Sequence, residues 1–333
     1  MRIVFMGSPE FALPALRRLI ESEHEVAAVY TQPDRPVGRG RRPAPPPVKL
    51  LALDHGIEVR QPASIGRPEP VEELRRLAPD IGVIAAYGQI LKQPVLDVPP
   101  LGVLNVHASL LPRWRGAAPI PAAILAGDAE TGATIMRVRL ALDAGPVLAS
   151  VHVPIAPSDT TGTLTPKVAE AGAELLMRVL PAYVAGAISP VEQDEALATY
   201  APQIRKTDAL IDWERDDAQT VWRKVRAYNP WPGAYTYAGG EPLRILACLL
   251  VERGGAAAPR PDAPLRTGRM AGSVFALHGT DAGFGVVARE GAVAVTSVQA
   301  PGGRVMPAAA YLRGHPRLVG TRLTAPNVSA PPM

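Results

Sequence analysis

Short apolar runs alternate with stretches of helical periodicity from residue 1 to about residue 187. The apolar runs predict strands at 3–6, 26–30, 81–86, 103–106 and 134–138, and the periodic stretches predict helices at 9–20, 70–77, 119–126 and 165–183. Uninterrupted apolar runs are typical of strands buried on both faces, and strands that alternate with helices indicate a parallel sheet covered by helices. The pattern therefore predicts an α/β domain over residues 1–187, with a Rossmann-like, doubly wound and mostly parallel sheet.

The pattern changes after a polar connector that contains proline, which we interpret as a linker over residues 188–207. Beyond it, one predicted helix at 218–226 precedes short strands separated by glycines, at 235–237, 243–251, 272–276, 285–288, 293–298 and 304–307. Several short strands in about 100 residues are typical of a small barrel. We therefore predict a second, β-rich domain over residues 208–333. Its segment 254–265 is rich in Ala and Pro and is expected to be a disordered loop.

Composition supports this division. The chain has 333 residues, of which 47% are apolar, which is enough for two cores. We find no apolar run long enough to cross a membrane and no signal peptide before the first strand, so we expect a cytoplasmic protein, and a monomer. The single cysteine, Cys248, lies in an apolar run, and we interpret it as a core residue rather than a nucleophile.

Charge is distributed unevenly along the chain. Residues 1–204 hold 19 Lys and Arg against 21 Asp and Glu, whereas residues 205–333 hold 16 against 10. A basic C-terminal half suits a partner with a phosphate backbone, such as RNA. A composition that simply places arginine on solvated surfaces explains the surplus nearly as well, so both interpretations stay open.

The predicted strand at 103–106 leads into the candidate catalytic residues. Asn105 and His107 are two residues apart and therefore point to the same face, at the strand end where open α/β sheets bind ligands. Asp143 follows on a loop punctuated by Gly145, from which it can reach His107 and fix its tautomer and charge. Each residue alone is more often structural. Together, an amide, an imidazole and a carboxylate can stabilise a tetrahedral oxyanion while a proton moves.

The loop after the first strand argues against a nicotinamide enzyme. Residues 7–12 read GSPEFA and lack the G-x-G-x-x-G of dinucleotide-binding sites. We expect Ser8 to cap a helix that has Pro9 at its first position and Glu10 at the positive end of its dipole. The six histidines and one cysteine show no ligand spacing, so we expect no metal.

Several blocks of the sequence resemble the folate-dependent formyltransferases. The run from Asn105 to Pro119 reproduces a block of that family almost letter for letter, and further matching blocks lie at 6–12, 31–42, 86–91, 200–204 and 226–234. The resemblance covers most of the chain and implies a Rossmann-like catalytic domain followed by an OB-like C-terminal barrel that binds tRNA. It also implies a reaction, in which the formyl group of 10-formyltetrahydrofolate passes to the amino group of methionine on initiator methionyl-tRNA.

The resemblance also implies a role for individual residues. It implies catalytic roles for Asn105, His107 and Asp143, which would bind the formyl oxygen and move a proton. It implies folate contacts from two loops, namely Ser109, Leu110, Leu111 and Pro112 in one and Tyr87, Gly88, Ile90 and Leu91 in the other. A basic loop after the second strand is implied to contact tRNA phosphates through Arg35, Arg39, Arg41 and Arg42. A solvated flexible loop is the ordinary alternative for such a basic run.

Two other functions stay open at this point. A folate-dependent formyltransferase that acts on an amino-sugar nucleotide would share Asn105, His107 and Asp143, but it would not need the basic loop. A tRNA-binding module without catalytic activity would need the basic loop, but the three intact catalytic candidates argue against it.

Overall fold

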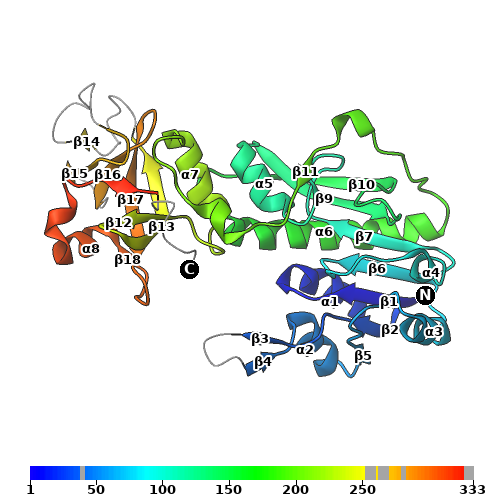
Figure 1. The fold of residues 1–333 in the computed structure, drawn as a ribbon. Coiled ribbons are helices and arrows are strands. Elements are labelled where there is room, and N and C mark those ends of the chain that lie inside the picture. Colours follow the sequence, from blue (N-terminus) through cyan, green and yellow to red (C-terminus); the bar gives the residue numbers. More distant parts are fainter. Residues whose placement is uncertain (38–41, 252–259, 262–269, 279–282, 326–333) are drawn as a thin grey trace. The chain divides into compact units, whose positions relative to one another are not determined.

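The computed structural model describes residues 1–37, 42–251, 260–261, 270–278 and 283–325 (Figure 1). Contacts divide the chain into two compact units. The N-terminal unit comprises Met1–Ile120, Ala129–Ile155 and Leu164–Pro202, and the C-terminal unit comprises Pro121–Asp128, Ala156–Thr163 and Gln203–Met333. The domain bounds predicted from the sequence, with a linker at 188–207, stay a prediction.

The N-terminal unit is built on a seven-stranded sheet in the order β10-β9-β7-β6-β1-β2-β5. Its strands are β1 (Arg2–Gly7), β2 (Glu25–Tyr30), β5 (Val59–Arg60), β6 (Ile81–Ala85), β7 (Val103–His107), β9 (Glu130–Arg137) and β10 (Val147–Pro154). The pairings from β5 through to β7 are parallel, whereas β9 pairs antiparallel with both β7 and β10. The predicted mostly parallel, Rossmann-like sheet is confirmed.

Helices cover both faces of this sheet because successive side chains of β1 enter two different cores. Ile3 and Phe5 lie in one core with residues of α1, α2 and α6, while Val4 and Met6 lie in another with residues of α3 and α4. This is the predicted doubly wound arrangement. These helices are α1 (Leu13–Ile20), α2 (Pro47–Asp54), α3 (Pro68–Arg76), α4 (Gln93–Leu96) and α6 (Thr161–Val184). Most of α5 (Pro119–Ala126) belongs to the C-terminal unit.

Short elements occupy the connections. The described part of the basic loop forms a hairpin of β3 (Arg35–Val37) and β4 (Arg42–Ala44). A parallel pair joins two segments far apart in sequence, β8 (Arg115–Gly116) and β11 (Tyr200–Ala201). Two 3-10 turns complete the set, η1 (Glu10–Ala12) and η2 (Glu195–Leu197).

The C-terminal unit holds an eight-stranded sheet in the order β14-β15-β16-β17-β13-β12-β19, with β18 paired to β17. Its strands are β12 (Tyr235–Ala238), β13 (Glu241–Leu250), β14 (Arg260–Pro261), β15 (Val274–His278), β16 (Phe284–Val287), β17 (Ala292–Gln299), β18 (Met306–Pro307) and β19 (Leu323–Thr324). The named strands pair antiparallel throughout the described part of this unit, and β13 shifts register against β17. The predicted small OB-like domain is confirmed as a curled antiparallel sheet.

Two helices pack with this sheet in one core, and the single cysteine lies in that core. Residues of α7 and α8 pack in one core with the strands, and Cys248 lies in that core. Burial raises the pKa of the Cys248 thiol to about 12, as expected of a core residue. The remaining elements are α7 (Ala218–Ala227), α8 (Ala308–Gly314), η3 (Lys206–Ala209) and η4 (Pro316–Leu318).

The structure differs from one local prediction and does not describe most of the residues of another. The prediction that Ser8 caps a helix is wrong, because the chain enters η1 with Pro9 at the N-cap. Ser8 Oγ instead donates to the carbonyl of Tyr87 (3.3 Å) and accepts from the amide of Gln32 (3.0 Å). The loops after β1, β2 and β6 meet here, so the hydroxyl joins them. The predicted disordered loop at 254–265 lies outside the described residues, except for Arg260 and Pro261, which form β14.

Candidate active site

The end of β7 positions Asn105 and His107. These residues pair with Met136 and Thr134 of β9, so they occupy the same face of the sheet. The His107 side chain is buried, and its Nε2 lies 3.0 Å from the carbonyl oxygen of Trp114. Because a carbonyl only accepts hydrogen bonds, Nε2 must carry a hydrogen. Nδ1 is therefore the ring nitrogen that is available to exchange a proton.

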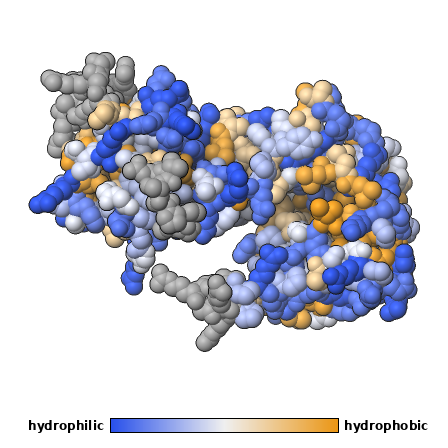
Figure 2. All heavy atoms as spheres, in the orientation of Figure 1, coloured by the Kyte–Doolittle hydropathy of each residue, from blue (hydrophilic) through white to orange (hydrophobic). Residues whose placement is uncertain are grey.

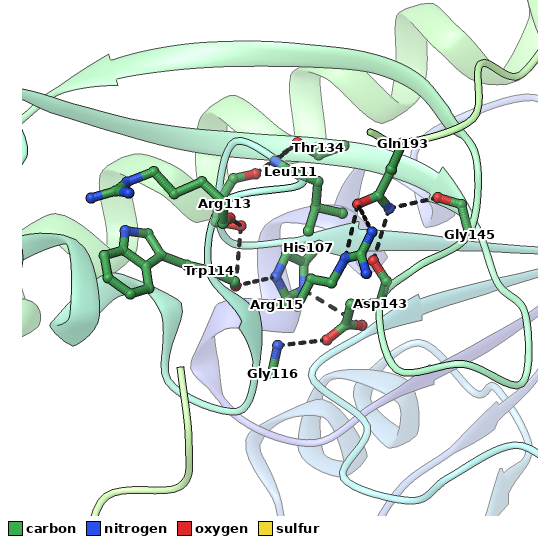
Figure 3. A network of polar contacts seen from close by, with 11 residues as sticks. His107, Leu111, Arg113, Trp114, Arg115, Gly116, Thr134, Asp143, Gly145 and Gln193 are labelled. Carbon is green, nitrogen blue, oxygen red and sulfur yellow. Dashed lines mark hydrogen bonds and ion pairs between the residues drawn. The ribbon is translucent and has the colours of Figure 1, made fainter. Parts of the chain in front are cut away.

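Asp143 approaches the Nδ1 side of that ring (Figure 3). Its Oδ1 lies 3.8 Å from His107 Nδ1, and its Oδ2 accepts a hydrogen bond from the amide of Gly116 at 2.9 Å. The loop that carries Asp143 begins beside the start of β7, where Arg137 pairs with Leu104, and folds back to the strand's end. The structure thus brings the predicted histidine and carboxylate together.

Internal hydrogen bonds hold the first predicted folate loop, Ser109 to Pro112. The hydroxyl of Ser109 is buried and donates to the carbonyl of Arg113 at 2.7 Å. Thr134 Oγ1 donates to the carbonyl of Ser109 (2.7 Å) and accepts from the amide of Leu111 (3.2 Å). The side chain of Ser109 therefore shapes the loop, while Leu110, Leu111 and Pro112 are half-buried along it.

The second predicted folate loop, Tyr87 to Leu91, divides into buried and exposed positions. Tyr87 and Leu91 lie in the core, and burial raises the pKa of the Tyr87 phenol above its ordinary value. The carbonyl of Tyr87 accepts from Gln32 Nε2 (3.2 Å) as well as from Ser8. Ile90 is 81% exposed, so this loop offers a ligand one apolar side chain and its backbone.

Three residues that surround the Asp143 loop were not predicted as site residues, namely Arg115, Gln193 and Glu195. Arg115 is buried and donates to Gln193 Oε1 and to both carboxylate oxygens of Glu195, at 2.8 to 3.0 Å. Gln193 in turn donates from Nε2 to the carbonyls of Asp143 (2.8 Å) and Gly145 (2.7 Å). Arg115 lies inside the matched block at 105–119, whereas Gln193 and Glu195 lie in the predicted linker, where no motif marks them.

The basic loop is only partly described. Arg35 donates from Nη2 to Gln32 Oε1 (3.2 Å), Arg42 begins β4, and Arg39 and Arg41 lie outside the described residues. The base of the β3–β4 hairpin is fixed by Lys49, whose Nζ bonds Asp34 and Gln61 at 2.8 Å. The hydrogen bonds from Lys49 and Gln61 lower the pKa of the Asp34 carboxyl.

The described residues form neither a group suited to a metal ion nor a helix suited to span a membrane. Within 1–37, 42–251, 260–261, 270–278 and 283–325, no three His, Cys, Asp or Glu side chains gather in a way that could hold a metal ion. Within the same ranges, no helix is both long and apolar enough to span a membrane.

Comparison with protein families decides the classification. The model of the formyl transferase family matches residues 1–180, and that of the formyl transferase C-terminal domain matches residues 203–316. The chain belongs to the formyl transferase family. The first match includes Asn105, His107 and Asp143, and the second includes the C-terminal strands from β12 to β18.

Individual relatives of this formyl transferase are similar over nearly its full length. A methionyl-tRNA formyltransferase from Methylococcus capsulatus is 50% identical over 97% of this chain and 99% of its own. One from Moorella thermoacetica is 46% identical over 96% of this chain and 98% of its own.

Solved structures share the fold at much lower identity. HypX from Aquifex aeolicus in complex with tetrahydrofolic acid superposes on the whole chain with a TM-score of 0.63 at 22% identity, and the chain spans 50% of that protein. An N-formyltransferase from Helicobacter canadensis, in complex with folinic acid and dTDP-3-aminofucose, gives a TM-score of 0.60 at 15% identity, over 88% of this chain and 98% of its own.

Proposed function

We propose that this formyl transferase acts on tRNA: it transfers the formyl group of 10-formyltetrahydrofolate to the amino group of methionine on initiator methionyl-tRNA. The observation that carries this proposal is the similarity to methionyl-tRNA formyltransferases, which extends over 97% of this chain and 99% of one such relative. We expect the protein to act in the cytoplasm.

Asn105 and His107 serve the attack on the formyl carbon. The neutral amine of methionine forms a bond to the formyl carbon, and the carbonyl electron pair moves onto the formyl oxygen. Asn105 donates amide hydrogens to that oxyanion, and protonated His107 presents an Nδ1–H as a second, charged donor. Such preorganised donors are typically the largest single contribution to catalysis.

Asp143 supports the proton transfers that follow. The tetrahedral species collapses as the bond to N10 of the folate breaks, N10 takes up a proton, and the new amide nitrogen loses one. Because Nε2 of His107 is occupied by the Trp114 carbonyl, Nδ1 is the ring nitrogen that exchanges the proton. The Asp143 carboxylate, 3.8 Å from Nδ1, stabilises the imidazolium by charge.

The folate site is proposed on the loops at the same edge. A pterin has a flat apolar face and polar edges, so it suits apolar side chains beside backbone donors and acceptors. Three apolar side chains stand exposed on the loops after β6 and β9, namely Ile90 at 81% and Leu140 and Leu142 at 60% each. Figure 2 shows apolar side chains gathered on one face of the N-terminal unit. Leu110, Leu111 and Pro112 are proposed as further contacts.

The proposed tRNA contacts come from the hairpin arginines, Arg35, Arg39, Arg41 and Arg42. The Lys49–Asp34–Gln61 contacts fix the base of the hairpin, so the loop whose sequence carries these arginines starts from a fixed point. The 16 Lys and Arg against 10 Asp and Glu of residues 205–333 add a basic surplus that favours binding to phosphates.

The first test is the reaction itself. Incubation of the full chain with 10-formyltetrahydrofolate and charged initiator tRNA, followed by release of the amino acid and mass analysis, should yield formylmethionine. An amino-sugar nucleotide in place of the tRNA should yield no formylated product. Formylation of the sugar without formylation of methionine would contradict the proposal.

The second test concerns the hairpin. Reversing the charges of Arg39, Arg41 and Arg42 together should weaken tRNA binding and leave folate binding unchanged. Each lost phosphate contact should flatten the slope of log affinity against log salt by about 0.7 to 0.9. Reversal of the exposed Arg67, Arg75 and Arg76 near α3 changes the net charge equally and is the matched control. Equal slopes for both triple variants would show that the hairpin arginines do not contact the tRNA phosphates.

A further inference from the structure

A buried arginine connects the catalytic loop to a distant segment of the chain. Arg115 is 1% exposed, yet it makes four hydrogen bonds, two to Gln193 (Figure 3) and two to Glu195. The hydrogen bonds to Glu195 raise the pKa of the Arg115 guanidinium and lower that of the Glu195 carboxyl. A bidentate arginine–carboxylate pair is among the most directional contacts in proteins.

Arg115 also fixes the orientation of the Gln193 side chain. A guanidinium can only donate, so the amide oxygen of Gln193 must face Arg115. The amide nitrogen then points the other way, and its two hydrogens serve the carbonyls of Asp143 and Gly145. Both donors of one side chain thus bracket the turn that carries the catalytic carboxylate.

That turn needs such support. Asp143 has a φ of 47°, in the left-handed region that non-glycine residues seldom adopt. Gly145 leaves no space for adjustment, since a Cβ at that position would lie 1.8 Å from the carbonyl oxygen of Arg137. Conformations of this kind persist only where the surroundings fix them.

The segment that carries Gln193 and Glu195 is itself held at both ends. Val191 forms an isolated bridge with Val147 at the start of β10, and Tyr200 and Ala201 pair with Arg115 and Gly116. The segment therefore crosses over the catalytic loop as a fixed strap.

We propose that Arg115, Gln193 and Glu195, which we call the Arg115 clamp, are positioning residues that hold Asp143 beside His107. None of the three is required to touch a substrate. They affect turnover by fixing the backbone of Asp143 and, with it, the position of its carboxylate. That carboxylate accepts a hydrogen bond from the Gly116 amide at 2.9 Å. The kinetic part of this proposal rests on the proposed function, whereas the structural part does not.

The sharpest variant is Gln193→Glu, because it separates the two sides of the clamp. A glutamate keeps the size of the side chain and an acceptor for Arg115, but it replaces both donors to the Asp143 and Gly145 carbonyls by an oxygen that repels them. We expect kcat for formyl transfer to fall about a hundredfold, as for a catalytic group displaced by about 1 Å, while the Kd for tetrahydrofolate stays unchanged. The exposed Gln203, changed to Glu, is the matched control.

Two further readouts separate positioning from general stability. Amide hydrogen exchange at Gly116 should accelerate in Gln193→Glu and not in Gln203→Glu, since that amide bonds the Asp143 carboxylate. In an Asp143→Asn background, Gln193→Glu should cause little additional loss of kcat, because both changes act on the same group.

The proposal is overturned by unchanged Gly116 exchange in Gln193→Glu, or by an equal loss of kcat in the wild-type and Asp143→Asn backgrounds. Wild-type protein that does not formylate charged tRNA would contradict the proposed function alone. The exchange measurement needs neither tRNA nor formyl donor, so it decides the clamp in either case. Because Arg115→Ala would leave an unpaired carboxylate and a cavity, Glu195→Gln serves as the second, milder variant, with an expected effect smaller than that of Gln193→Glu.

Discussion

The carboxyl edge of the N-terminal sheet and the core of the C-terminal sheet differ in backbone conformation. Four non-glycine residues with positive φ occur in the described N-terminal unit, and Ala86, Trp114 and Asp143 lie in its candidate site. In the described part of the C-terminal unit, positive φ is confined to glycines. Backbone strain is thus concentrated in the loops that form the candidate site.

The two regions also differ in how closely their polar side chains pair with one another. In the C-terminal core, Trp213 donates from Nε1 to Thr236 Oγ1 at 2.9 Å, and Lys224 pairs with Asp216 at 2.5 Å. At the catalytic edge, Asp143 stops 3.8 Å short of His107, which leaves an electrostatic contact rather than a closed hydrogen bond. We therefore expect the C-terminal core to contribute stability, and the edge that carries His107 and Asp143 to contribute the proposed chemistry.

The largest expected effect follows from removing a group of the site. Replacing Asn105, His107 or Asp143 singly by Ala should lower kcat for formyl transfer by about 10²- to 10⁴-fold, because each acts on the transition state. Single-turnover assays measure the loss, and thermal unfolding checks the fold. Near-normal turnover of His107→Ala would show that this edge of the sheet does not supply the catalytic groups.

Trp213→Ala should act in the opposite way. The side chain is 2% exposed in the C-terminal core, so its removal should lower the free energy of unfolding by about 3–5 kcal/mol. Urea unfolding measures this change. At a temperature where the variant is folded, its kcat should stay within a few-fold of wild type. A loss of kcat as large as that of Asp143→Ala would show that the two regions are not separable in function.

Apolar pattern predicted the frame of the molecule but not the fine structure of the site. The strands β1, β6 and β7 are continuous apolar runs, so they were predicted to within a residue or so. β10 was missed because Ser150 and His152 interrupt its apolar residues, so it does not stand out as one continuous apolar run. α2 was missed because prolines precede it without a capping side chain.

The candidate site divides in the same manner. Asn105 and His107 share a strand, so their common face follows from spacing alone. The contact of Asp143 with Gly116 depends on how a loop folds back, and the pairing of Arg115 with Gln193 joins positions 78 residues apart. Contacts of that range are set by tertiary structure and leave no local pattern.

A smaller effect on catalysis should come from Gly145→Ala. A Cβ there would lie 1.8 Å from the backbone oxygen of Arg137, so the turn that carries Asp143 must shift. We expect a loss of kcat of about tenfold or more, below that of Asp143→Ala, with folate binding retained. Gly186→Ala is the control for a glycine whose Cβ would meet open space, although its positive φ will cost some stability. Equal kcat for Gly145→Ala and wild type would show that the turn tolerates displacement.

The smallest expected effect concerns the C-terminal core, whose closure can be tested through the pH dependence of stability. The pKa of Cys248 is raised to about 12 by burial, so the folded protein keeps the thiol neutral where the unfolded chain, with a pKa near 9, already ionises. The stability contributed by a raised pKa is fully present below about pH 9 and is lost as the pH rises towards 12. Urea unfolding at pH 8 and pH 10 should therefore show wild type losing about 1 kcal/mol more than Cys248→Ala. The phenols of Tyr30 and Tyr228, whose pKa values burial also raises to about 12, titrate in both proteins and cancel in this difference. Equal losses in the two proteins would mean that water reaches the thiol, and that the C-terminal core is less closed than the comparison requires.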